Sequence, residues 1–221
     1  MKKQFAVIGL GRFGGSICNA LADEGMDVLA IDSNEYRVNE FAQVVTQAVI
    51  ADGMDEKALR GLGIRNFDNV IVAIGDNIQA SIMTTIVLDE IGVKHITVKA
   101  QNDYHEKVLR RIGAHEVIHP ERDIGVRVAH SIVSKSVLDY LELSEDYSIV
   151  ELEAGQLLDG KSLLDLDIRE TYECNVLAIK RGEDVHVSPR PEVDISEGDI
   201  LIIVGADGDI ARLEARWIDD N

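Results

Sequence analysis

The stretch Phe5-Ala-Val-Ile-Gly-Leu-Gly-Arg-Phe-Gly14 sets a short apolar run directly before three glycines in the pattern GxGxxG. The run predicts a buried strand, and the periodic sequence after it predicts a helix to about residue 24. Between the two, Gly9 permits a tight turn, Gly11 lets a diphosphate approach the backbone, and Gly14 lets the helix pack on the strand. The amino end of such a helix favours phosphate. We therefore predict a nucleotide-binding loop, and the alternative is a tight strand–helix turn without a ligand.

Two residues near this loop narrow the choice of nucleotide. Asp32 ends the second predicted strand, 18 residues after Gly14, where a carboxylate accepts hydrogen bonds from ribose hydroxyls and repels a 2′-phosphate. This disfavours NADP as the ligand, whereas NAD, ATP, ADP and AMP all remain candidates. Arg12 lies in the loop at the helix start, where a guanidinium is suited to a terminal phosphate. The alternative for Arg12 is a solvated surface arginine.

Apolar runs and helical patterns alternate over the first 120 or so residues. The predicted strands cover residues 5–8, 27–31, 48–51, 69–73, 95–99 and 116–119. The predicted helices between them cover residues 35–41, 56–62, 78–91 and 103–112, and Ser33 is placed to cap the first of these. Continuous apolar strands separated by helices indicate a parallel sheet covered on both faces. The fold class is α/β, a Rossmann-like doubly wound parallel sheet.

A small α+β C-terminal lobe is predicted after this sheet. A helical pattern beginning at Pro120 runs to about residue 136 and is assigned to the first domain, as a crossover helix. The domains are therefore expected at residues 1–140 and 141–221. Within the second, the predicted strands cover residues 147–153, 174–180, 185–188 and 200–204, and the predicted helices lie near residues 162–166 and 208–217. So small a lobe buries a limited core, which makes dimerisation through one face a reasonable expectation.

Composition excludes several classes of protein. The formal net charge is −18 and no cluster of Lys and Arg stands out, which argues against a nucleic-acid partner. No apolar run is long enough to span a membrane, and the N-terminal run reads as a strand rather than an export signal, so a cytosolic location is expected. Cys18 and Cys174 each lie in an apolar pattern, so buried free thiols are expected rather than a disulfide.

No catalytic residue is expected. There is no GxSxG nucleophile turn, neither cysteine has an obvious partner, and none of the six histidines is assigned to catalysis or to a metal site. A small NAD-dependent oxidoreductase would need an acid or base in the C-terminal lobe, and none is apparent there. An NADH-sensing regulator of transcription would need a basic helix-turn-helix, which is also missing. These two readings stay as the alternatives to a nucleotide-binding regulatory subunit.

The opening stretch resembles that of the cytosolic regulatory subunits of Ktr-type potassium uptake systems, which consist of an RCK domain (regulator of potassium conductance). The likeness is closest to the KtrA/KtrC branch and spans nearly the whole chain. It continues through these segments: Ala51-Asp52-Gly53, Gly63-Ile64-Arg65-Asn66, Val72-Ala-Ile-Gly75, Asn77-Ile78-Gln79-Ala80-Ser81, Val98-Lys-Ala-Gln-Asn102, Ile118-His-Pro-Glu-Arg122, Asp167-Ile168-Arg169 and Ala178-Ile-Lys-Arg181.

The resemblance implies a subunit that is not an enzyme and that switches between ATP-bound and ADP-bound ring conformations. Its implied partners are a membrane potassium-translocating subunit and further copies of itself, as dimers in an octameric ring at the inner face of the membrane. Glu121 is implied to help hold a divalent cation, Mg²⁺ or Ca²⁺, between nucleotides at the dimer interface; the alternative is a glutamate favoured by a helix dipole. The implied nucleotide-binding residues are Gly9, Gly11, Arg12, Phe13, Gly14, Asp32, Arg37, Asp52, Ala73, Ile74, Gly75 and Lys99.

The resemblance also implies that the C-terminal lobe binds cyclic di-AMP. Arg169 is the implied phosphate partner and Asn175 the implied hydrogen-bonding amide. Without the resemblance, Ile168 and Val176 read as core residues. The implied cyclic di-AMP residues are Ile168, Arg169, Asn175, Val176 and Pro189. The sequence departs from the usual pattern of this family at Ala51-Asp52-Gly53-Met54, on the adenine side of the nucleotide site.

Overall fold

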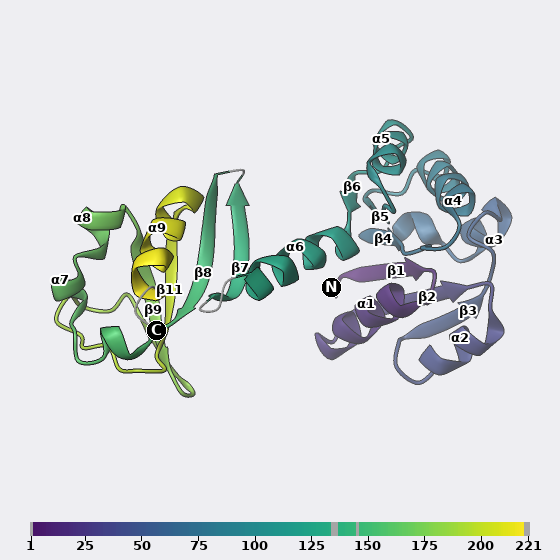
Figure 1. The fold of residues 1–221 in the computed structure, drawn as a ribbon. Helices are drawn as coiled ribbons and strands as arrows, with labels where there is room; N and C mark the ends of the chain where they lie inside the picture. Colours follow the sequence, from purple (N-terminus) through teal and green to yellow (C-terminus); the bar gives the residue numbers. More distant parts are fainter. Residues whose placement is uncertain (1, 134–136, 145, 219–221) are drawn as a thin grey trace. The chain divides into compact units, whose positions relative to one another are not determined.

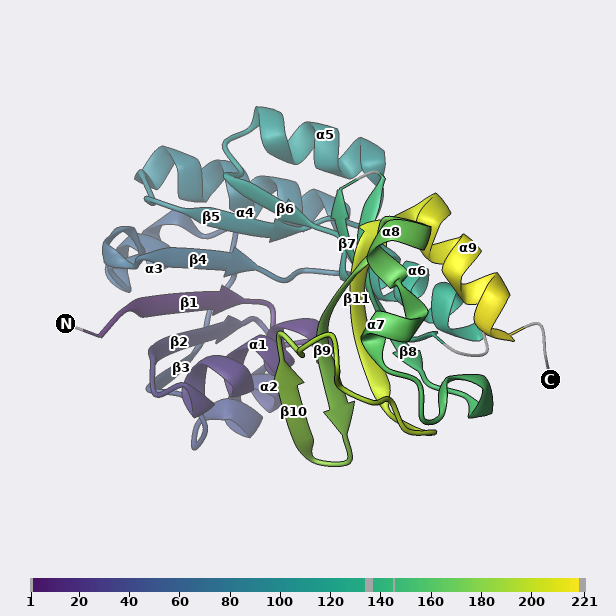
Figure 2. The same cartoon turned by 90° about the vertical axis from the view of Figure 1, so that its left-hand side faces the viewer.

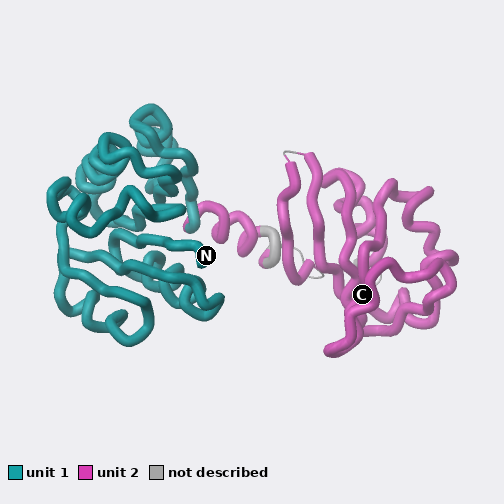
Figure 3. Tube along the Cα trace, turned by 180° about the vertical axis from the view of Figure 1, so that it is seen from behind, with its two compact units in different colours: residues 1–120 teal, residues 121–221 magenta. Residues whose placement is uncertain are grey.

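The computed structural model describes residues 2–133, 137–144 and 146–218. Its contacts divide the chain into two compact units, residues 1–120 and residues 121–221 (Figure 3). The crossover helix predicted from Pro120 is grouped by these contacts with the second unit. The domain boundary expected at residue 140 stays a prediction.

The first unit is built on a six-stranded sheet in which every neighbouring pair of strands is parallel (Figures 1 and 2). The strand order is β3-β2-β1-β4-β5-β6, so the direction of winding reverses between β1 and β4. The predicted doubly wound parallel sheet is thereby confirmed. The strands are β1 (Gln4–Ile8), β2 (Asp27–Asp32), β3 (Gln47–Ile50), β4 (Asn69–Val72), β5 (Ile96–Lys99) and β6 (Glu116–Ile118).

Helices cover both faces of this sheet because successive strand residues point to opposite sides. Val7 and Ala30 pack with α1 and α2, whereas Ile8 and Ile31 pack with α3, α4 and α5 on the other face. All four of these strand residues are at most 2% exposed. The helices are α1 (Arg12–Asp23), α2 (Glu35–Phe41), α3 (Glu56–Gly61), α4 (Ile78–Ile91) and α5 (Asp103–Arg111), with a 3-10 turn η1 (Ile64–Asn66).

The cap of α2 differs from the prediction. Asn34, and not Ser33, precedes the helix, and its side-chain oxygen accepts hydrogen bonds from the N–H groups of Tyr36 and Arg37. Both residue types are good N-caps, so the choice depends on where the first helical turn begins. In the structure the first turn begins one residue later than Ser33 requires, and Asn34 N–H also donates to the carboxylate of Asp32 at 2.8 Å.

The second unit carries a five-stranded antiparallel sheet in the order β10-β9-β11-β8-β7. Its core contains Leu152, Ile179, Leu201 and Ile203, each at most 1% exposed. This confirms a smaller C-terminal lobe of strands and helices. The elements are α6 (Pro120–Val133), β7 (Val137–Ser144), β8 (Tyr147–Glu153), the 3-10 turn η2 (Gln156–Leu158), α7 (Leu163–Leu166), α8 (Ile168–Tyr172), β9 (Asn175–Arg181), β10 (Asp184–Val187), β11 (Ile200–Ala206) and α9 (Asp207–Ile218).

β7, α8 and the 3-10 turn η2 of this unit were not predicted. β7 pairs with β8 as an edge strand, and only Val137 of its eight residues is buried. Its apolar residues do not alternate strictly with polar ones, so the segment lacks the pattern that identifies a strand in sequence. The last part of the helix predicted to residue 136 lies outside the described residues.

Two remaining expectations concern the membrane and the cysteines. Within the described residues, no helix has both the length and the apolar character needed to cross a membrane. Cys18 and Cys174 are both buried and both free. Burial raises the pKa of the Cys18 thiol to about 12 and that of Cys174 to about 11. The predicted buried free thiols are confirmed.

Candidate nucleotide-binding site

The predicted nucleotide residues of the first unit gather at one edge of its sheet. Gly9 follows β1, Asp32 ends β2, Asp52 follows β3, Ala73 follows β4, and Lys99 ends β5. These are the carboxyl ends of parallel strands, and the winding of the sheet reverses between β1 and β4 at this same edge. Ligands of doubly wound sheets bind in the crevice at such a switch point.

Two of the three loop glycines are required by the fold itself. Gly9 has φ +98°, in the region that favours glycine, and its N–H donates to the carbonyl of Ile31 at 2.8 Å. A Cβ atom on Gly14 would lie 1.9 Å from the carbonyl oxygen of Gly9 and 3.0 Å from the Cβ of Ala73. Glycine at these positions would be needed with or without a ligand.

Gly11 is different, because no protein atom requires it. Its φ of −69° and ψ of −171° suit any residue, and a Cβ placed there would meet nothing within 4 Å. Gly11 is the N-cap of α1, a position where Ser, Thr, Asn and Asp are preferred as well. The missing side chain leaves open space beside the free N–H groups of the helix start, where a phosphate fits.

Asp32 is 7% exposed and holds the loop in place. Its Oδ2 accepts a hydrogen bond from the N–H of Leu10 at 2.7 Å, and its Oδ1 accepts one from Asn34 at 2.8 Å. Arg37 Nη1 lies 3.5 Å from Asp32 Oδ2. A carboxylate has about four lone-pair positions, so these contacts leave capacity for ribose hydroxyls. The sequence spacing did not reveal the contact with Leu10.

Arg12 and Lys99 supply positive charge at the same edge. Arg12 is the first residue of α1, it is exposed, and its guanidinium has no hydrogen bond or ion pair within the described parts of the chain. Lys99 is 8% exposed, and its Nζ lies 5.5 Å from the centroid of the Phe13 ring. A Cβ on Gly75 would lie 3.6 Å from the same Nζ, so this cation sits between the loop and the end of β4.

The segment after β3, where the sequence departs from the family pattern, is tightly packed. A Cβ on Gly53 would lie 2.8 Å from Thr84 Oγ1 and 2.9 Å from Ile8 Cγ2, so glycine is needed there. Asp52 is exposed and its Oδ1 accepts the N–H of Met54 at 2.9 Å. Ala73 is buried, whereas Ile74 and Gly75 are partly exposed. The adenine-side assignments stay predictions.

The other predicted sites belong to the second unit. Glu121 lies in the first turn of α6 and is exposed, as the helix-dipole reading also requires. Ile168 is 4% exposed in the core, and Val176 packs against that core. Arg169 on α8 and Asn175 at the start of β9 are both exposed. Pro189 follows β10 and is partly exposed.

The histidines were expected to show no HExxH spacing, but residues His115 to His119 do carry the letters of this zinc motif. That motif requires a helix, so that both imidazoles lie on one face. Here Glu116–Ile118 is strand β6, and His115 Nδ1 instead accepts the N–H of Ile96 at 3.2 Å. The two histidines therefore do not form the motif's metal site.

Comparisons with known proteins cover almost the whole chain. The TrkA-N domain model matches residues 5–120, and the TrkA-C domain model matches residues 147–216. Ktr system potassium uptake protein C of Bacillus subtilis (strain 168) is 61% identical over 98% of both chains. Ktr system potassium uptake protein A of the same organism is 56% identical over 96% of both chains. The crystal structure of the GsuK RCK domain, 16% identical, has the same fold, with a TM-score of 0.71 over 99% of this chain and 48% of that chain.

Proposed function

Since this chain belongs to the Ktr system potassium uptake proteins, with a TrkA-N and a TrkA-C domain, we propose that it regulates potassium uptake by sensing ATP and ADP. Membership in a family of potassium uptake proteins agrees with the expectation that the chain is not an enzyme. The sensor is the glycine loop at the carboxyl edge of the first sheet. Its output is a change of conformation passed to a membrane potassium-translocating subunit.

The observation that carries the proposal is the open space at Gly11. The fold accounts for Gly9 and Gly14 but does not require a glycine at Gly11, so the space beside the helix start is open to a phosphate. Asp32 lies at the end of the neighbouring strand with lone pairs to spare for ribose. Together these residues accept a nucleotide with a free 2′-hydroxyl.

Discrimination between ATP and ADP is assigned to Arg12. Its guanidinium leaves the start of α1 without a protein partner in the described parts of the chain, so a terminal phosphate gains a charge-assisted contact without breaking another. Such a contact contributes about 1.5–3 kcal/mol, which favours the triphosphate by roughly 10- to 150-fold. That difference is large enough to shift a two-state protein.

The proposal extends to the assembly and to a second ligand. Glu121 would help hold Mg²⁺ or Ca²⁺ between nucleotides of two subunits, and dimers would form an octameric ring at the inner face of the membrane. The C-terminal lobe would bind cyclic di-AMP, with Arg169 on a phosphate and Asn175 on a base. Both polar side chains are exposed, which such contacts require. Ile168 and Val176 would act from the core, by shaping the surface around them.

Calorimetric titration of the full chain with ATP, ADP and NAD tests the proposal. We expect saturable binding of ATP and ADP, with ATP binding more tightly in the presence of Mg²⁺. NAD is the competing ligand, because it also carries a free 2′-hydroxyl. Preferential binding of NAD would replace the proposal with that of an NAD-responsive regulator, and hydride transfer to any substrate would indicate an oxidoreductase.

A further inference from the structure

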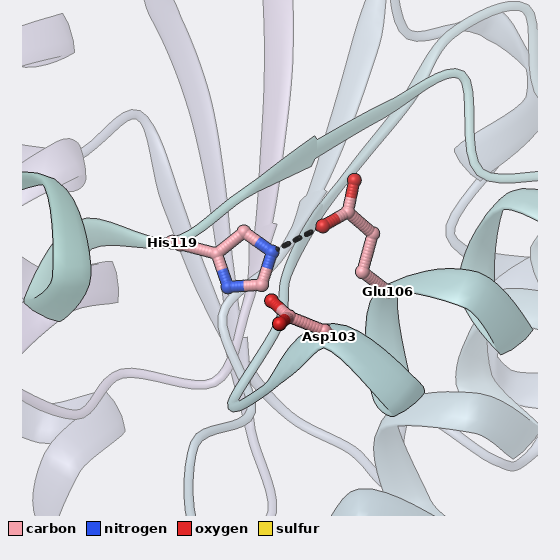
Figure 4. Close-up of side chains that lie close together, drawn as sticks. All are labelled: Asp103, Glu106 and His119. Carbon is pink, nitrogen blue, oxygen red and sulfur yellow. Dashed lines mark hydrogen bonds and ion pairs between the residues drawn. The ribbon is translucent and has the colours of Figure 1, made fainter.

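Three metal-ligating side chains meet on the first unit, apart from the residues assigned to the nucleotide. Asp103 and Glu106 come from α5, and His119 follows the end of β6 (Figure 4). One carboxylate oxygen of each acid and one ring nitrogen of His119 all lie within 4.8 Å of one another. An imidazole and two carboxylates form a donor set that divalent transition metals use.

Local structure explains why these groups converge. Asp103 and Glu106 stand three residues apart on a helix, so their side chains share one face. Asn102 caps α5 by accepting the N–H of His105 at 3.0 Å, which fixes the first turn that carries both acids. β6 runs parallel to β5, the strand that leads into this helix, so its carboxyl end brings His119 to the same edge.

The pair at the centre of the cluster is already ordered. His119 Nε2 and Glu106 Oε2 are 2.7 Å apart, and the two side chains are 7% and 22% exposed. The other oxygen of Glu106 accepts a hydrogen bond from Arg110 Nε at 2.8 Å. In metal sites, partners of this kind orient the ligand from outside. Arg110 is therefore the residue that positions Glu106.

We propose that Asp103, Glu106 and His119 bind one divalent transition-metal ion, with Zn²⁺ as the best fit. Zn–N and Zn–O bonds of about 2.0–2.2 Å place tetrahedral ligand atoms roughly 3.3–3.5 Å apart. The distance between His119 Nε2 and Glu106 Oε2 would increase slightly, and the longer distances between ligand atoms of the cluster would decrease. The ion would take the place of the proton between Glu106 and His119, which leaves to solvent. Mg²⁺ and Ca²⁺ fit less well, because they prefer all-oxygen ligands.

Neighbouring groups narrow the ligand set to these three. His105 is 3% exposed, and its Nδ1 accepts the N–H of Gln101 at 3.3 Å, so its neutral ring carries the proton on Nε2 and offers no lone pair there. Cys18 and Cys174, the two cysteines of this chain, are buried with raised thiol pKa values. Solvent would complete the coordination on the side of Asp103, which is exposed.

The ion would join α5 to the residue that precedes Pro120 and α6. Because all three ligands belong to residues 1–120, binding needs neither the second unit nor a nucleotide. The expected consequence is a first unit that unfolds at a higher temperature when Zn²⁺ is present, since a ligand that binds only the folded state stabilises it.

The test is Zn²⁺ binding to the untagged full chain without nucleotide, measured by calorimetry against a competing chelator. We expect one site per chain, weakened at least about tenfold by Glu106→Gln and by Asp103→Asn. Glu56→Gln is the matched control, because Glu56 pairs with Arg60 at the same spacing as Glu106 with Arg110 but is not part of the cluster.

Three results would overturn the proposal. The first is the absence of saturable Zn²⁺ binding, and the second is equal affinity in the wild type, Glu106→Gln and Asp103→Asn, which would indicate an ion bound elsewhere on the surface. A measurement on the wild type alone tests the proposal even if the variants fail to fold. Zn²⁺ should shift the ring nitrogen resonances of His119 in the NMR spectrum, and an unchanged His119 would also overturn it.

Discussion

The carboxylate of Asp32 accepts a hydrogen bond from the N–H of Leu10 at 2.7 Å, joining residues 22 positions apart in the sequence. Leu10 lies between the first two glycines of the loop, so the acid at the end of β2 fixes the backbone that receives the phosphates. Asp32 is thus part of the loop's structure as well as the proposed partner of ribose. A change at this residue affects folding and binding together.

Asp32→Asn separates these two roles in part. The two carboxylate oxygens each accept one hydrogen bond, from the N–H of Leu10 and from the N–H of Asn34. The asparagine amide has only one acceptor oxygen. One of the two N–H groups is left facing the amide NH2 group, which costs about 1 kcal/mol of stability. Urea unfolding measures this loss, and Asp27→Asn at the other end of β2 is the control. Equal stability of Asp32→Asn and wild type would contradict the structural role.

Substitutions at two positions of the glycine loop should have opposite effects on nucleotide binding and on stability. Gly11→Ser keeps a good N-cap and meets no protein atom, so the melting temperature should change little while ATP affinity falls at least about tenfold. Gly14→Ala places a methyl group against the carbonyl of Gly9 and should destabilise the protein by at least about 1–3 kcal/mol. Thermal unfolding and calorimetry distinguish the two. Unweakened ATP binding by a folded Gly11→Ser protein would mean that no phosphate occupies this space.

Much of this edge was predictable from sequence, because it depends on local patterns. Strand, glycines and Asp32 follow a fixed order along the chain, and the parallel sheet brings their ends together. The bond from Leu10 to Asp32 was not predictable, since it depends on the exact path of two loops. The cluster of Asp103, Glu106 and His119 was missed for a similar reason. Two of its members lie on a helix and the third follows a strand, and no sequence spacing predicts that they meet.

The second unit shows where local patterns fail. Val137 is the one buried residue of β7, and Leu138, Leu141 and Leu143 are exposed on this edge strand. The apolar residues of β7 do not alternate strictly with polar ones, so the sequence gives no clear strand signal. The cap of α2 is a second example, because Ser33 and Asn34 are both good N-cap residues, and their sequence alone does not show that Asn34 takes this position.

The pair of Arg181 and Asp199 predicts how the second unit responds to acid. Arg181 donates two hydrogen bonds to Asp199, which is 2% exposed, and holds the pKa of that carboxyl below its usual value. A carboxyl with a lowered folded-state pKa stabilises the protein fully above its unfolded pKa of about 3.9 and loses this contribution as the pH falls further. Arg181→Met should therefore lower the melting temperature at neutral pH, and by less as the pH falls below about 3.9.

Thermal unfolding of both proteins across this pH range is the measurement. Arg127→Met is the control, because Arg127 pairs with Asp139 where both side chains are about half exposed, and such surface pairs contribute little. A difference between Arg181→Met and wild type that stays constant down to about pH 3 would contradict the assigned role.

The cysteines should be inert in the folded protein. Burial raises the thiol pKa of Cys18 to about 12 and that of Cys174 to about 11, so almost no reactive thiolate is present at neutral pH. A thiol reagent should modify neither residue until denaturant is added, and then both. Rapid labelling of either thiol in the native protein would show that its surroundings open readily.

The central claim is that Arg12 distinguishes a triphosphate from a diphosphate, and the ratio of ATP to ADP affinity in Arg12→Ala tests it most directly. Calorimetry on wild type and variant, with the same Mg²⁺ concentration, gives the four dissociation constants. We predict that the wild type binds ATP more tightly than ADP. In the variant this preference should fall by roughly 10- to 150-fold, because only the affinity for ATP decreases. An equal loss of affinity for both nucleotides, or no loss at all, would contradict the account.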